Sequence, residues 1–167
     1  EAVRVDLNVF LAEVENEYAV TEPKLTMELE SETPCAEVME KEAMKRFLLS
    51  IYAVHNGVYA MSQDMPGLVE TSSNLASIKM RDGKIIVGTS QRSSILSSRK
   101  DMSQMIRAAF ELGGAETTTG DGYPGWKPNP SSEILGVAVE SYKRLFGVEP
   151  KIKAIHAGLE CGLFLEK

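Results

Sequence analysis

Residues 68–90 read LVETSSNLASIKMRDGKIIVGTS, and this stretch decides the fold. Two β-like runs, Leu68 to Met80 and Ile85 to Ser90, are joined through Asp82-Gly83. An Asp-Gly dipeptide suits a tight hairpin, because glycine tolerates the positive φ that such turns require. The stretch therefore predicts two long antiparallel strands.

The segments around this hairpin follow helical or strand periods. Ser98-x-x-Asp101 resembles a capping box, which predicts that a helix begins there. The other turns fall at Asn56-Gly57, Pro66-Gly67, Gly113-Gly114 and Gly147. The pattern predicts helices over 3–18, 39–51, 102–110 and 134–146, and further strands over 25–30, 58–61 and 151–155.

This order of elements indicates an α/β fold of the α+β type, in which helices cover a mainly antiparallel sheet. The stretch Thr117 to Pro130 is rich in glycine and proline and carries Tyr123-Pro124-Gly125-Trp126 at its centre. We interpret it as a shaped crossover, which divides the chain into a sandwich over residues 1–115 and part of a second α/β domain over residues 116–167.

Composition excludes several classes of protein. A net charge of -6 and a sequence pI near 5.1 disfavour a nucleic-acid partner. No apolar stretch approaches the roughly 20 residues that cross a bilayer, so no membrane partner is expected. Cys35 and Cys161 lie far apart, which fits reduced thiols in a cytosol. The chain begins without Met inside an amphipathic pattern, and we expect it to be an internal piece of a longer protein.

Metal and nucleophile chemistry find little support. The two histidines, His55 and His156, lie in no recognised ligand spacing, so no autonomous metal site is predicted. His156, Glu160 and Cys161 could form a cysteine hydrolase, which predicts inactivation by thiol alkylation and indifference to chelators. A thiol in an apolar turn is usually inert packing, and His55 fits an ordinary turn histidine.

Recognition of a ligand is the better-supported chemistry. Arg92 follows a strand and could clamp a carboxylate by two parallel hydrogen bonds, or remain a solvated charge. Trp126 could wall a pocket or pin the crossover to a core. Gly158 lies in a glycine-flanked turn that a ligand could approach closely. Glu160 could meet an ammonium or imidazolium group, or stabilise a helix N-terminus.

Five ordered motifs resemble those of the aminoacyl-histidine dipeptidases, a branch of the carnosinase-like di-zinc metallopeptidases. The resemblance is weak over the first 50 residues and strong afterwards. The motifs are Asn56-Gly57-Val58 through Met61-Ser62, Gly67-Leu68-Val69-Glu70-Thr71-Ser72 with Asn74, Gln91-Arg92-Ser93-Ser94, Gly122-Tyr123-Pro124-Gly125-Trp126 and His156-Ala157-Gly158-Leu159-Glu160-Cys161-Gly162-Leu163-Phe164.

The resemblance implies a cytoplasmic enzyme with a catalytic domain that holds two zinc ions and an inserted lid that binds substrate and forms a homodimer. Residues 1–115 would be the later part of the lid and 116–167 a partial catalytic domain. Metal ligands and catalytic residues would lie outside this chain, so the piece alone would be inactive. The reaction implied is hydrolysis of unblocked dipeptides, including Xaa-His, by a zinc-bound water.

Site residues follow from the same resemblance. Arg92 matches the arginine that closes the last lid strand and binds the substrate carboxylate. Gly158 and Glu160 lie in a turn that borders the substrate. Trp126 stands where carnosinase-like relatives carry a histidine, which keeps a contact role but removes imidazole chemistry. The alternative is a non-catalytic lid-like binding or dimerisation module, which would lack a His-x-Asp upstream and a histidine ligand downstream.

Overall fold

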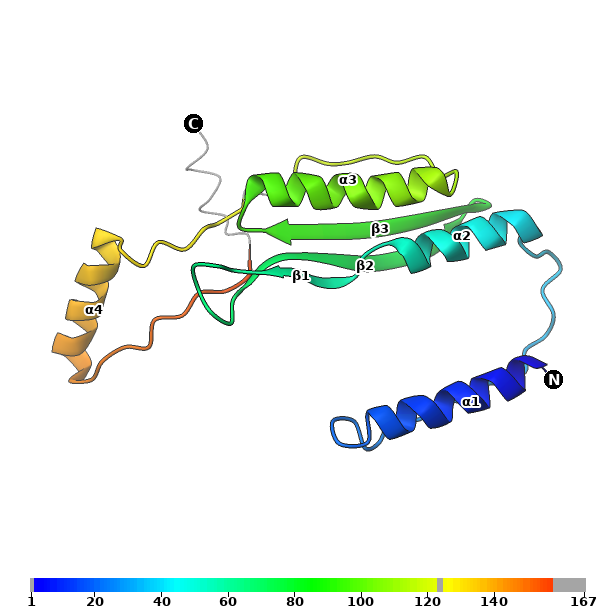
Figure 1. Cartoon of the computed structure of the whole chain (residues 1–167), viewed down its shortest axis with the longest axis horizontal. Coiled ribbons are helices and arrows are strands. Elements are labelled where there is room, and N and C mark those ends of the chain that lie inside the picture. The colour runs from blue at the N-terminus through cyan, green and yellow to red at the C-terminus, as the bar shows by residue number, and fades with distance from the viewer. Residues whose placement is uncertain (1, 123–124, 158–167) are drawn as a thin grey trace. The chain divides into compact units, whose positions relative to one another are not determined.

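The computed structural model describes residues 2–122 and 125–157. It is a mixed α/β structure, as the sequence predicts (Figure 1). The elements within the described ranges are α1 (Ala2–Glu17), α2 (Lys41–Ala53), β1 (Gly57–Met61), β2 (Val69–Arg81), β3 (Lys84–Ser93), α3 (Leu96–Leu112) and α4 (Glu133–Phe146). They fall into two compact units, Glu1–Met39 and Glu40–Lys167.

The first unit contains α1 and the chain that follows it. The helix confirms the prediction from the apolar stripe, although side chains of that stripe such as Val3 and Phe10 remain exposed. Arg4 of α1 donates a hydrogen bond of 3.0 Å to the Ser31 hydroxyl. The strand predicted over 25–30 is wrong, because those residues pair with no strand in the described part of the chain. Alternating polarity alone does not make a strand, which requires a hydrogen-bonded neighbour.

The second unit is built on the predicted hairpin. β2 and β3 are antiparallel and turn at Asp82 and Gly83, whose φ angles are 49° and 71°. Two successive positive φ values are those of a type I′ turn, and this explains the Asp-Gly pair. β1 pairs with the other side of β2, which gives the sheet order β1-β2-β3.

The core lies where α3 covers one face of this sheet, with α2 packed against α3. Met102, Ile106 and Phe110 are the buried residues of α3, and they recur at the four-residue spacing of a single helix face. Val54 joins them after α2, while Leu75 and Val87 pack against this cluster from β2 and β3. Because side chains alternate along a strand, the sheet also has a far face that points away from this core.

Helix ends test the predicted boundaries. The capping box predicted at Ser98 is wrong: α3 begins earlier, at Leu96, and its N-cap residue Ile95 offers no side-chain hydrogen bond. The end of α4 is as predicted, with Gly147 at φ 71° in the left-handed region that favours glycine.

α2 has a side-chain cap that the sequence analysis did not identify. The Glu40 carboxylate accepts hydrogen bonds from the backbone N–H groups of Glu42 and Ala43, at 2.9 and 2.8 Å. These two bonds lower the pKa of Glu40.

Residues 113–157 leave the sheet and partly return to it. The chain after α3 runs back along that helix in extended form (Figure 1). The strand predicted over 151–155 is wrong, since those residues pair with no strand of the sheet. The described part of the chain contains no helix long and apolar enough to cross a membrane.

Candidate functional site

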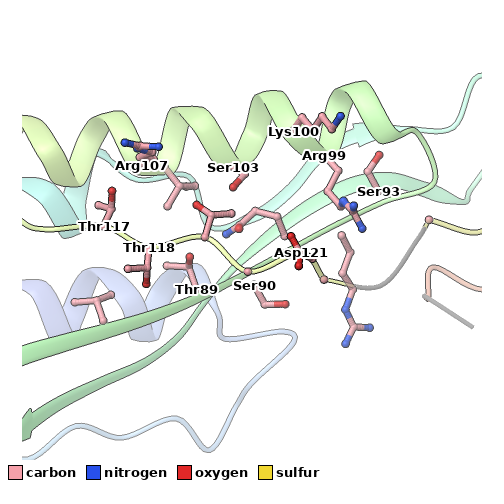
Figure 2. Close-up of a pocket in the computed structure, with 18 of the residues that line it drawn as sticks. Thr89, Ser90, Ser93, Arg99, Lys100, Ser103, Arg107, Thr117, Thr118 and Asp121 are labelled. Carbon is pink, nitrogen blue, oxygen red and sulfur yellow. The ribbon is translucent and has the colours of Figure 1, made fainter. Parts of the chain in front are cut away.

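A cavity of about 1440 Å³ follows the free edge of β3. Its walls come from β3, from α3 and from the extended segment 114–122, and polar side chains from all three line it (Figure 2). At the carboxyl end of β3 it is also lined by Arg92, Trp126 and His156. The structure therefore brings two of the sequence-predicted site residues, Arg92 and Trp126, to one cavity, and adds a histidine to them.

Arg92 lies one residue before the end of β3, on the far face of the sheet. Ser72 of β2 is its cross-strand partner. The Arg92 side chain is exposed, and among the residues described it has no ion pair or hydrogen bond. A guanidinium at a strand end with no carboxylate partner among the described residues has donor groups that can bind an anion.

Buried hydroxyl groups fix the strand end on the opposite face. Thr71 and Ser93, the neighbouring cross-strand pair, are buried and their hydroxyl oxygens lie 2.8 Å apart. The Ser93 hydroxyl also accepts a hydrogen bond of 3.0 Å from the N–H of Ile95. Because buried polar groups are costly unless paired, these bonds hold the end of β3 and the start of α3 in one geometry.

The crossover packs directly against this strand end. A Cβ atom built on Gly125 would lie 2.4 Å from the carbonyl oxygen of Ser93, so only glycine allows this approach. Gly125 in turn places the half-buried Trp126, which lines the cavity and also an adjoining apolar groove of about 770 Å³ beside α4. The indole thus walls a cavity, as one of its two predicted roles requires.

A salt bridge joins the next residue of the crossover to the β1–β2 connection. Lys127 Nζ lies 2.6 Å from Asp64 Oδ2, and the two side chains are 61% and 64% exposed. The hydrogen bond to Asp64, followed by its charge, raises the pKa of Lys127. Because both side chains are exposed, solvent screens the attraction and the pair contributes little to stability.

His156 is the site residue that the sequence analysis did not single out for recognition. Its Nε2 atom lies 2.8 Å from the hydroxyl oxygen of Ser72, a residue 84 positions away. Burial, and then the positive charge of Arg92, lower the pKa of His156, while a hydrogen bond with the backbone of Val69 opposes them. Burial and the charge of Arg92 both favour the neutral imidazole over the charged one. No local sequence signal points to this contact, since its partner lies on β2.

The remaining predicted residues divide into two groups. Gly158, Glu160 and Cys161 lie outside the described residues. His55 lies between α2 and β1, as expected of a turn histidine, with its ring 5.4 Å from that of Tyr59 in an edge-on contact. Within ranges 2–122 and 125–157, no group of three His, Cys, Asp or Glu side chains is arranged to hold a metal ion.

Comparison with known proteins shows that the chain is similar to dipeptidases. It is 34% identical over 158 residues to the cytosol non-specific dipeptidase of Escherichia coli (strain K12), an alignment that covers 95% of this chain and 33% of that protein. No family model matches.

The chain is also similar to a solved structure. The chain superposes on the crystal structure of aminoacylhistidine dipeptidase from Vibrio alginolyticus with a TM-score of 0.84 and 36% identity. The match covers 95% of this chain and 32% of that one, so the chain spans about a third of the length of its relatives. The resemblance to aminoacyl-histidine dipeptidases that the motifs predict is confirmed, and so is the mixed α/β fold.

Proposed function

We propose that this chain is the substrate-recognition part of a cytoplasmic metallodipeptidase that hydrolyses unblocked dipeptides, including Xaa-His. The observation that carries the proposal is the exposed Arg92 guanidinium at the end of β3, which has no ion-pair partner among the described residues and lies on the same cavity as Trp126 and His156. This arrangement occurs in a chain that is about a third identical in sequence to two dipeptidases.

Arg92 would bind the C-terminal carboxylate of the dipeptide. A planar guanidinium can donate two parallel hydrogen bonds to the two carboxylate oxygens, which fixes both the position and the orientation of that group. Trp126 would form an apolar wall beside it. Gly158 and Glu160 remain proposed contacts for the rest of the substrate.

The described residues offer no ligand set for zinc, so two zinc ions and the catalytic residues would belong to polypeptide other than these residues. The contribution proposed for this chain is therefore binding and orientation of the substrate, which lowers the entropic barrier to the reaction. We also expect the full-length protein to form a homodimer through the lid domain.

The test is an assay of the full-length protein with three related substrates: a dipeptide, the same dipeptide with an acetylated N-terminus, and the same dipeptide with a C-terminal amide. We expect the free dipeptide to be cleaved fastest, and activity to be lost with a chelator and restored by zinc. Thiol alkylation should have no effect. A full-length protein that cleaves none of the three would instead be a non-catalytic binding or dimerisation module.

A further inference from the structure

On the far face of the sheet, the hydrogen bond between Ser72 and His156 bridges distant parts of the chain. It joins β2 to the segment that follows α4, across 84 residues of sequence. That segment pairs with no strand of the sheet, so backbone ladder bonds do not hold it there. A side-chain bond is consequently important for its placement.

The contact lies next to Arg92. Ser72 is the cross-strand partner of Arg92, and directly opposed residues on antiparallel strands carry their side chains on the same face about 5 Å apart. Arg92 and His156 also line the same end of the cavity, and the positive charge of Arg92 contributes to the lowered pKa of His156. All described interactions of His156 are therefore with residues around Arg92.

A neutral imidazole suits this place better than a second cation. A neutral ring has one nitrogen that donates and one that accepts, so it can bond the backbone of Val69 with one and the Ser72 hydroxyl with the other. It does so without adding a positive charge that would repel the guanidinium.

We infer that Ser72 and His156 are positioning residues for the carboxylate subsite of Arg92. Their hydrogen bond fixes residues 155–157 on the far face, so that these residues form the side of the cavity next to the guanidinium and limit where a bound carboxylate can lie. This inference rests on the proposed function, because it assigns the two residues to the same subsite.

The experiment measures kcat and KM of the full-length protein for a dipeptide and for its C-terminal amide. Ser72→Ala and His156→Ala should each reduce the preference for the free carboxylate about tenfold, mainly by raising KM, as expected when a hydrogen bond that orients a binding group is lost. Arg92→Ala should abolish the preference. Ser72→Thr and His156→Gln keep hydrogen-bonding groups in place and should retain most of it.

Ser97→Ala is the matched control. Ser97 is exposed in the first turn of α3, lies outside the lining of the cavity and has no side-chain hydrogen bond among the described residues, so its removal should leave both substrates unaffected. Thermal melts of every variant establish that each is folded at the assay temperature.

Two different failures can be told apart. If the wild-type protein discriminates between the substrates but Ser72→Ala and His156→Ala do not alter that preference, or lower activity on both substrates equally, the positioning role is wrong and the proposed function stands. If the wild-type protein cleaves no dipeptide, the proposed function is wrong and this inference fails with it.

Discussion

The two faces of the β2–β3 hairpin differ sharply although their residues alternate along the same strands. On the face toward α3, Thr71 and Ser93 are buried and bonded to each other, beside a core centred on Met102. On the far face, the adjacent cross-strand pair is Ser72 and Arg92. Ser72 forms a hydrogen bond with His156, and Arg92 lines the cavity. One register thus builds both a rigid support and, on the other face, a charged surface that lines a cavity.

This difference shows how a small core can fix the position of the exposed Arg92 residue. The buried hydroxyl pair ties the end of β3 to the start of α3, and this fixes the backbone of the residue that carries the guanidinium. Changes on the two faces should therefore have separable effects, on stability in one case and on substrate recognition in the other.

The largest effect should come from the core face. Met102 is fully buried, so Met102→Ala removes packed atoms and leaves a cavity, and the free energy of unfolding should fall by about 2–5 kcal/mol. Denaturant titration of the chain measures this change. Met80→Ala, at an exposed position of β2, is the control and should change it by less than about 0.5 kcal/mol.

On the far face, Arg92→Ala in the full-length protein should lower kcat/KM for a dipeptide by about one to three orders of magnitude, because a charge-assisted pair worth on the order of 2–4 kcal/mol is lost. Its melting temperature should hardly change, since the side chain has no described partner. Arg81→Ala, an exposed arginine at the hairpin end of β2, serves as control. An unchanged kcat/KM would remove Arg92 from the site.

The junction between the two faces is tested at Gly125. Gly125→Ala places a methyl group against the Ser93 carbonyl, so the crossover must shift, and we expect a loss of about 1–3 kcal/mol in stability together with weaker dipeptide hydrolysis. Gly136→Ala in α4 meets open space and should instead be neutral or stabilise by up to about 1 kcal/mol. Equal behaviour of the two variants would show that the crossover does not need this close approach.

The smallest effect is the pH dependence that His156 adds. Its pKa is lower in the folded chain than the usual 6.5, so the unfolded state binds more protons in mild acid. The stability that the neutral His156 contributes to the folded state is fully present above pH 6.5. It is lost as the pH falls through the pKa of His156 in the folded chain. Melting temperatures of the wild type should therefore fall more steeply below pH 6.5 than those of His156→Gln, while parallel curves would show that His156 is not the group responsible.

The site was predicted only in part. Arg92 and Trp126 could be chosen from sequence because an arginine at a strand end and a tryptophan in a glycine- and proline-rich crossover stand out locally. The structure places both on one cavity, and their contact with substrate stays a prediction. His156 could not be assigned its present place, because Ser72 and Val69 belong to a strand more than 80 residues earlier.

By itself, the sequence determined the hairpin, its Asp82-Gly83 turn, the helical stretches and the end of α4, since each depends on side chains within a few residues of one another. Only the tertiary structure decided that residues 25–30 and 151–155 are not strands, that α3 begins at Leu96, and that Arg92, Trp126 and His156 share a cavity. Strand pairing and cavity formation depend on partners distant in the chain, and local periodicity carries no information about them.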